Sequence, residues 1–377
     1  MSGLDRRTLL KLAGGTGVAG LNALAGCTGG GGGGQAQETT TTTTTDAQGT
    51  TTTTTTGDPV NIGMVYALGG LGDKSFNDMA NKGVKRAKSE LGVKYTNAEP
   101  GSQSEIETLQ RKFAQSTSPT YELVVTVGFV QATPLKKNAD RYPDQKWTII
   151  DSVVEKDNVA SYVFKEHQGS FQVGYLAGLM TTKDFSAGAG STNDDTVVGF
   201  VGGKQIPLIQ KFQAGYMAGV KHADSDITIR SAYAGAWNDP ATGKAIANSM
   251  YSEGADIVYH AAGGTGIGVF KAAQESGRYA IGVDSDQSRS APEFANVILA
   301  SMVKHVDVAV FESVENVVNG TFKGSVHRLG LQKNGVEAVL GQQLGSAIPS
   351  SVTDKLETSR QAIVSGEISV PTNPDAV

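Results

Sequence analysis

The sequence predicts an α/β protein with two lobes, preceded by an N-terminal segment that lies outside the fold. Short, nearly continuous apolar runs alternate with helical patterns from residue 60 onward. Glycine and polar residues recur directly after these runs, where ligands bind in open α/β sheets. The first 57 residues have instead the composition of an export signal and a linker.

The apolar runs are short and rich in β-branched residues, which is typical of strands buried on both faces of a parallel sheet. We predict strands at Val60–Ala67, Glu122–Val127, Trp147–Ile150, Val197–Val201, Ile227–Tyr233, Asp256–Ala261 and Tyr279–Val283. We predict helices at Phe76–Leu91, Ser104–Ser116, Gln168–Thr182, Gln210–Lys221, Ala241–Ser252, Gly268–Glu275 and Pro349–Ser365. Single helices between strands imply right-handed βαβ crossovers. Because about 320 residues follow the N-terminal segment, two lobes are favoured over one sheet.

Residues 1–27 have the pattern of a twin-arginine (Tat) export signal. Arg6 and Arg7 precede a weakly apolar stretch of about 13 residues, which is too short to span a bilayer. The sequence LAGC that ends at Cys27 resembles a lipobox, in which the cysteine is acylated and becomes the mature N-terminus. The six consecutive glycines from Gly29 leave Cys27 no core to enter. We therefore predict a lipid anchor at Cys27.

Residues 28–57 are predicted to be a disordered tether. They contain the glycine run and two runs of seven threonines, at Thr39–Thr45 and Thr50–Thr56. Such a composition buries too little apolar surface to offset the entropy of ordering. The expected architecture is a folded body tethered to the outer face of the cell membrane.

Charge and cysteine content exclude several classes of protein. Lys and Arg number 32 against 37 Asp and Glu, so the net charge of -5 provides no basic field for nucleic acid. One cysteine excludes a disulfide within the chain, a zinc finger and an iron–sulfur cage. Five scattered histidines provide no ligand spacing for a metal, so neither a metal site nor a cofactor is predicted.

Several predicted strands are followed by residues suited to a ligand. Asp73–Asn77 follows the first strand, and Phe129 and Gln131 follow the second. Further along the chain, Gly264 and Gly266 follow one strand and Asp284 another. Glycine permits close approach of the backbone, and helix N-termini offer free N–H donors. Their recurrence at the same end of many units predicts a shared small-molecule site.

Catalytic motifs are missing from the sequence. The segment that starts at Asp239 is similar to a phosphate-binding loop, but it lacks the leading glycine and the hydroxyl residue. We interpret it as a helix start with Asp239 at the N-cap and Pro240 at the first helical position. No G-x-S-x-G, H-E-x-x-H or C-x-x-C pattern occurs, so no catalytic residue is predicted.

Five segments, taken in order, resemble one known family. Asp73–Asn77 (DKSFN) looks like the D-x-S-F-N box of the basic membrane protein family, PnrA-like substrate-binding lipoproteins of ABC importers. Residues 166–177 (EHQGSFQVGYLA) resemble its E-x-x-G-S-F-x-x-G-Y-L-A segment. Further boxes resemble residues 198–203, 255–268 and 281–287.

The resemblance implies the type I periplasmic-binding-protein fold, with two Rossmann-like lobes and a three-crossing hinge. The expected function is capture of a solute, commonly a purine nucleoside, by lobe closure, followed by docking on an ABC permease. We expect lobe 1 at 58–165 and 302–325, and lobe 2 at 166–301 and 326–377. The protein is not expected to be an enzyme.

The resemblance also implies roles for particular side chains. Asp284 and Lys304 would hold the ribose hydroxyls, approaching from opposite lobes with Lys304 at a helix start. Asp73, Ser75 and Asn77 would address the base or the sugar edge. Trp237 would stack on the base. Asn81 stands where relatives often carry an aromatic residue, so Phe76, Phe129 and Phe212 are further stacking candidates.

Two alternatives remain at this stage. The solute is a sugar or another small polar molecule in one, and the chain is a secreted nucleoside-cleaving hydrolase in the other. Conversion of a nucleoside by the purified protein in buffer would identify the hydrolase.

The lipobox is tested by the substitution Cys27→Ser. Acyl burial contributes about 0.8 kcal/mol per CH₂ to membrane binding, so loss of the acylated cysteine should release the exported protein into the medium. Immunoblots of membrane and medium fractions measure this, with the neighbouring Thr28→Ser as the control that stays with the membrane. Equal retention of both variants would contradict the lipid anchor.

Overall fold

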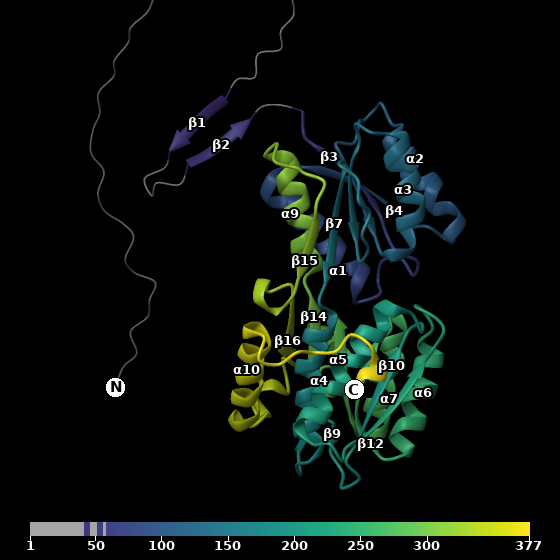
Figure 1. Ribbon diagram of the computed structural model, residues 1–377, viewed down its shortest axis with the longest axis vertical. Coiled ribbons are helices and arrows are strands. Elements are labelled where there is room, and N and C mark those ends of the chain that lie inside the picture. Colours follow the sequence, from purple (N-terminus) through teal and green to yellow (C-terminus); the bar gives the residue numbers. More distant parts are fainter. Residues whose placement is uncertain (1–40, 46–50, 56–57) are drawn as a thin grey trace, which may run out of the picture. The chain divides into compact units, whose positions relative to one another are not determined.

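The computed structural model describes residues 41–45, 51–55 and 58–377 (Figure 1). The chain divides into two units, Met1–Asp58 and Pro59–Val377. In the first unit, β1 (Thr41–Thr45) pairs antiparallel with β2 (Thr51–Thr55), within the segment predicted to be a tether. The export signal and Cys27 lie outside the described residues.

The second unit contains two six-stranded sheets, each the centre of one lobe (Figure 1). The lobe 1 sheet is wholly parallel, in the order β15-β7-β6-β5-β3-β4. Its strands are β3 (Asn61–Val65), β4 (Lys94–Ala98), β5 (Leu123–Val127), β6 (Lys146–Ile150), β7 (Val159–Phe164) and β15 (Val326–Leu329). Helices α1 (Phe76–Leu91), α2 (Ile106–Ala114), α3 (Ala132–Arg141) and α9 (Val306–Val318) cover it.

The lobe 2 sheet has the order β11-β10-β12-β13-β14-β16 and is parallel except for its last strand. Its strands are β10 (Val197–Gly202), β11 (Thr228–Tyr233), β12 (Ala255–Ala261), β13 (Tyr279–Asp284), β14 (Ile298–Lys304) and β16 (Val336–Leu340). Its helices are α4 (Glu166–Thr181), α5 (Pro207–Ala223), α6 (Pro240–Ser252), α7 (Gly266–Ser276), α8 (Gln287–Ser290) and α10 (Ser350–Ser365). A short hairpin, β8 (Ser186–Ala187) and β9 (Gly190–Ser191), extends from α4.

The chain crosses between the lobes three times, after β7, β14 and β15. The predicted α/β fold with two lobes is therefore confirmed. The second segment of lobe 1 differs from the expected 302–325 at both ends. At its start, β14 remains in the lobe 2 sheet as far as Lys304. At its end, β15, which was expected in lobe 2, joins the lobe 1 sheet beside β7.

Local sequence signals account for several element ends. Gly92 adopts φ 71° and ends α1, as expected for a residue in the left-handed region after a helix. At the start of α6 the Asp239 side chain accepts a hydrogen bond from the backbone of Thr242, with Pro240 as the first helical residue. The predicted helix start is thus confirmed. Among the described residues, no helix is long and apolar enough to cross a membrane.

Helices α4 and α5 pack unusually closely through facing glycines. A Cβ placed on Gly174 would lie 2.1 Å from the backbone oxygen of Tyr216, and one on Gly215 would lie 2.1 Å from that of His167. Such approach is possible only where neither helix carries a side chain at the contact. The α4–α5 contact therefore fixes α4, whose first turn lies at the crossing between the lobes.

Gly215→Ala should destabilise the protein by about 1–3 kcal/mol, because the added methyl group overpacks a backbone contact. The direction of the change is informative, because replacing glycine by alanine within a helix otherwise raises the free energy of unfolding by about 1 kcal/mol. Urea unfolding measures the change, with Gly101→Ala as a control whose added Cβ would meet only ordinary contacts at 3.5 Å and beyond. A stabilised Gly215→Ala variant would contradict the close contact.

Candidate functional site

The loops at the carboxyl ends of both sheets line a cleft between the two lobes. Parallel sheets place the ends of successive strands at one edge, so residues distant in sequence meet there. The apolar walls include four aromatic side chains, namely Phe76, Phe129, Phe212 and Trp237. The polar lining residues are Asp73, Asn77, Asp151, Asp284 and Lys304.

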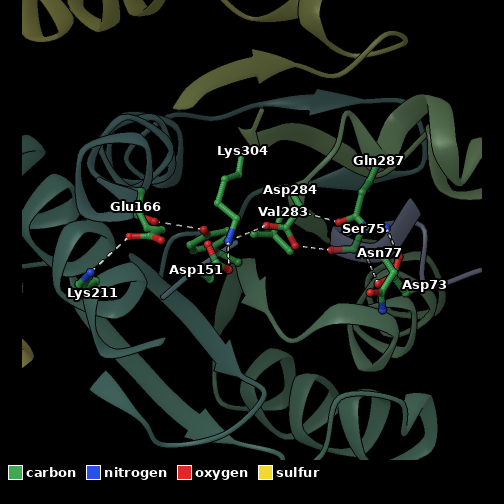
Figure 2. Close-up of polar contacts among 12 residues, drawn as sticks. Asp73, Ser75, Asn77, Asp151, Glu166, Lys211, Val283, Asp284, Gln287 and Lys304 are labelled. Carbon is green, nitrogen blue, oxygen red and sulfur yellow. Dashed lines mark hydrogen bonds and ion pairs between the residues drawn. The ribbon is translucent and has the colours of Figure 1, made fainter. Parts of the chain in front are cut away.

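A buried ammonium group lies at the floor of this cleft. Lys304 is the last residue of β14 in lobe 2, and its Nζ lies 2.7 Å from Oδ2 of Asp151, which follows β6 in lobe 1. The same Nζ lies 3.8 Å from Oδ1 of Asp284, the last residue of β13 (Figure 2). The Lys304–Asp151 pair thus joins the two lobes across the cleft.

Aromatic rings surround the Lys304 ammonium. Its Nζ lies 4.6 Å from the ring centroid of Phe76, and 5.4 and 5.5 Å from those of Phe212 and Phe164. Rings at these distances attract a cation through their negative faces. The rings also exclude water, which strengthens the ion pairs that hold the ammonium.

Carboxylates outnumber the ammonium at this floor. Burial alone would lower the pKa of Lys304, but Asp151, Asp284 and Glu166 together raise it above its ordinary value. Burial raises the pKa of Asp284, although Lys304 opposes this. Burial likewise raises the pKa of Glu166, the first residue of α4, to about 7, against the lowering influence of Lys304 and Lys211. The ammonium therefore stays charged, while Asp284 and Glu166 hold their protons more readily than exposed carboxyl groups do.

Both aspartates at the floor carry an oxygen that accepts no hydrogen bond from the described residues, and Oε2 of Glu166 accepts none either. The aspartate oxygens are Oδ1 of Asp151 and Oδ1 of Asp284, on side chains that are 4% and 8% exposed. Both aspartates adopt positive φ, 66° and 64°, a conformation that non-glycine residues seldom take. Buried acceptors without donors are unfavourable, and strained backbone concentrates at binding sites. This floor is suited to a solute that brings hydroxyl donors.

The Asp73–Asn77 loop has a largely internal hydrogen-bond network. Asp73 accepts from the backbone N–H groups of Ser75, Asn77 and Asp78 at 2.9, 2.9 and 3.2 Å, which caps the start of α1. Burial raises the pKa of Asp73 to about 6. Asn77 donates to the carbonyl of Gly70 and accepts from the N–H of Ala67, which holds the loop after β3. Asp73 and Asn77 line the cleft with polar atoms that are already engaged.

Ser75 does not line the cleft but supports its floor. Its side chain is fully buried, and its Oγ donates to Oδ2 of Asp284 at 2.5 Å (Figure 2). Ser75 belongs to lobe 1 and Asp284 to lobe 2. The hydroxyl therefore orients a floor carboxylate from across the cleft.

Other predicted site residues lie outside the cleft lining. The amide of Gln131 donates to the carbonyls of Val65 and Val127 at 2.7 and 2.8 Å, which ties together the ends of β3 and β5. Gly264 lies in the short 3₁₀ turn before α7, in which only Gly263 lines the cleft, and Gly266 is the first residue of α7. These three residues build the scaffold of the site.

Trp237 lies in the cleft wall against Gly203. A Cβ on Gly203 would come within 2.3 Å of the Trp237 ring, so the glycine makes room for the indole. Asn81, at the position where an aromatic was expected, is buried and accepts a hydrogen bond from the Tyr66 hydroxyl. Phe212 is buried, lines the cleft and approaches Lys304, as one of the further aromatic candidates.

The expected origin of the Asp284–Lys304 pair is wrong. Both residues end neighbouring strands of the lobe 2 sheet, in which Asp284 pairs with Val303. Lys304 was expected to open a helix after the crossing, but β14 continues through it and α9 begins at Val306. The partner from the opposite lobe is Asp151, whose position directly after a buried strand was the signal that could have identified it.

Two lobes joined by three crossings around a cleft with a polar floor define a hinged solute-binding protein. The sequence profile of the Bmp family, described as ABC transporter substrate-binding protein PnrA-like, matches residues 60–374. The chain belongs to this family.

Individual relatives agree with this assignment. An uncharacterized lipoprotein of Pyrococcus abyssi is 37% identical over 74% of this chain and 68% of its own length. Basic membrane protein A of Borreliella burgdorferi is 33% identical over 81% of this chain and 86% of its own. The crystal structure of an ABC transporter solute-binding protein from Aeropyrum pernix has a TM-score of 0.73 and 31% identity, covering 84% of this chain and 95% of that one.

More distant structures share the fold alone. A glucose-galactose binding protein from Geobacillus stearothermophilus has a TM-score of 0.53 at 16% identity, covering 77% of this chain and 100% of that one. Within the part of this chain that the structure describes, no group of three His, Cys, Asp or Glu side chains is placed to hold a metal ion.

The raised pKa of Glu166 predicts a pH-dependent stability. A carboxyl whose folded pKa is about 7 stabilises the fold most fully below its unfolded value near 4.5, and loses that contribution as the pH rises through 7. The parent should therefore lose stability relative to Glu166→Gln between pH 4.5 and 7.5, with a slope of at most about 1.4 kcal/mol per pH unit.

Urea unfolding of both proteins across this range measures the difference in free energy of unfolding. The exposed Glu367→Gln is the control and should track the parent at every pH. A constant difference between the parent and Glu166→Gln would contradict the predicted proton uptake at Glu166.

Proposed function

We propose that this protein captures a nucleoside, with purines favoured, for an ABC importer. The observation that carries the proposal is that Oδ1 of Asp151 and Oδ1 of Asp284 accept no hydrogen bond beside the Lys304 ammonium, at the floor of an aromatic cleft. A nucleoside combines a vicinal diol with a flat base. Each half has a complement in this cleft.

The ribose half suits the floor. Carboxylates accept hydrogen bonds from hydroxyl groups, and an ammonium donates to their oxygens. Because Asp151 belongs to lobe 1 and Asp284 to lobe 2, a diol that donates to both would join the lobes. Solute binding and lobe closure would then be the same event.

The base half suits the walls. Phe76, Phe129, Phe212 and Trp237 provide rings from both lobes. Stacking of a base on an aromatic ring contributes about 1–3 kcal/mol.

The charge of the cleft disfavours a phosphate. Lys304 is the sole cation among the described lining residues, and it is already paired with two aspartates. A phosphate would be repelled by the negative charges of Asp151 and Asp284 in surroundings of low dielectric constant. A neutral nucleoside is therefore a better solute than a nucleotide.

The proposed location is the outer face of the cell membrane, with acylated Cys27 as the anchor and an ABC permease as the partner. Relatives include proteins named lipoproteins and basic membrane proteins, which supports this location. The closed form of the two lobes would be the form that docks on the permease.

Calorimetric titration of the purified protein tests the solute. We expect adenosine or guanosine to bind, and their 2′-deoxy analogues to bind about 5- to 150-fold more weakly, because a missing hydroxyl leaves a buried carboxylate unpaired at about 1–3 kcal/mol. Asp284→Asn should remove most of this discrimination, since asparagine tolerates the same backbone conformation but carries no charge. The exposed Asp226→Asn is the matched control.

Three outcomes would overturn parts of this proposal. Equal affinity for ribo- and deoxyribonucleosides would contradict the diol site. Binding of free ribose or another sugar without any nucleoside binding would favour the sugar alternative. Conversion of the nucleoside to base and sugar during titration would identify a hydrolase.

A further inference from the structure

One backbone carbonyl of lobe 1 is held by three side chains of lobe 2. The carbonyl of Lys74, in the loop between β3 and α1, accepts from Ser285 Oγ at 2.7 Å, Ser290 Oγ at 3.0 Å and Gln287 Nε2 at 3.2 Å. All three donors lie in the loop and short helix after β13. We call these four residues the latch.

The lobe 1 side of the latch is fixed by its own loop. Lys74 has φ 56°, and Asp73 next to it accepts the N–H groups that begin α1. The N–H of Lys74 itself donates to Asp78 at 2.9 Å. With the peptides on both sides anchored, the Lys74 carbonyl is presented to lobe 2 in one orientation.

The lobe 2 side is equally fixed. Oε1 of Gln287 accepts from the backbone N–H of Val283 at 2.8 Å and lies 2.9 Å from Nε2 of His260 (Figure 2 shows Gln287 and Val283). His260 is fully buried, with its ring against Gly266, where a Cβ would come within 2.0 Å. Because its oxygen is engaged in this way, the Gln287 amide directs its N–H₂ group toward Lys74.

Ser285, Gln287 and Ser290 do not line the cleft. Their bonds to Lys74 therefore join the lobes without needing a solute, as do the Lys304–Asp151 and Ser75–Asp284 contacts. Oδ1 of Asp151 and Oδ1 of Asp284 are left for a solute to bridge. We propose that the latch stabilises the closed form relative to the open form before the solute binds. It would thereby raise the affinity for the solute without contacting it.

The latch is coupled to the cleft through one residue. Asp284 directly precedes Ser285, and its Oδ2 accepts the Ser75 hydroxyl of lobe 1, while its Oδ1 lies 3.8 Å from the Lys304 ammonium. Closing the latch brings Ser75 to Asp284 and orients that carboxylate for the solute. This inference rests on the proposed capture by lobe closure.

The expected effect follows from the number of bonds lost. A hydrogen bond within a protein contributes about 0.5–1.5 kcal/mol, so removing two hydroxyls should lower the closed-to-open ratio by about 5- to 150-fold. When only the closed form retains the solute, the apparent Kd rises as the closed fraction falls.

The test compares Ser285→Ala/Ser290→Ala with the parent and with Ser249→Ala/Ser252→Ala. The control pair also removes two hydroxyls from lobe 2, but their hydrogen bonds stay within α6 and its end. Spin labels at Lys136→Cys in lobe 1 and Lys271→Cys in lobe 2, both exposed, report the distance between the lobes in the full chain carrying Cys27→Ser.

Without solute, we expect a short-distance population in the parent and in the control, and its loss in the latch variant. A parent with no short-distance population, or a latch variant with the parent's distribution, would overturn the latch. Urea unfolding establishes that each variant is folded.

Titration with adenosine and guanosine supplies the second measurement. The latch variant should bind more weakly, by the ratio of the closed fractions that the distance measurement gives for the parent and the variant, and the control should bind as the parent does. Unchanged affinity in the latch variant would overturn the latch as a determinant of binding. If neither nucleoside binds the parent, the proposed solute is wrong, and the distance measurement alone decides the latch.

Discussion

The architecture of the cleft depends on one buried ammonium group. Lys304 would be unfavourable at 2% exposure without partners, and its two carboxylate partners come from different lobes. This requirement brings the end of β6 to the ends of β13 and β14. The aromatic rings around the ammonium then become the walls of the site, so a single charge organises both its polar and its apolar surfaces.

Much of the fold could be predicted because most buried strands are short, nearly continuous apolar runs that can be recognised in the sequence alone. Helix α1 spans the predicted Phe76–Leu91, and each of the seven predicted strands is present with small shifts at its ends. Five strands of the two six-stranded sheets were missed. Three of them, β4, β15 and β16, lie at sheet edges and are partly exposed, which weakens their apolar signal. The other two, β7 and β14, are apolar and buried, so their patterns should have been recognised as strands. The lobe to which a strand belongs depends on pairing with strands far away in the sequence. This explains why residues 326–329, which form β15 beside β7, were expected in the wrong lobe.

The site was only partly predictable for the same reason. Asp284 and Asp151 each follow or end a buried strand, and that position marks both as candidates. That Asp151 is the partner of Lys304 is revealed only when β6 and β14 face each other across the cleft. The Asp73–Asn77 motif predicts contacts with a ligand. In the structure, Asp73 instead accepts hydrogen bonds from the start of α1, and Asn77 bonds to the loop after β3. Spacing in a sequence locates such residues without distinguishing a side chain that contacts solute from one that shapes the loop.

The left-handed backbone at Asp151 and Asp284 restricts how this site can diverge. Asparagine and glycine are the residues that accept such a conformation readily, and either would remove the charge that balances Lys304. Lengthening either side chain to glutamate would strain the turn. Few residues can therefore replace Asp151 or Asp284, whereas the aromatic residues of the walls do not require a left-handed backbone. Under the proposed function, solutes of proteins with this floor would therefore differ in the part that meets the walls and share the hydroxyl-bearing part that meets the floor.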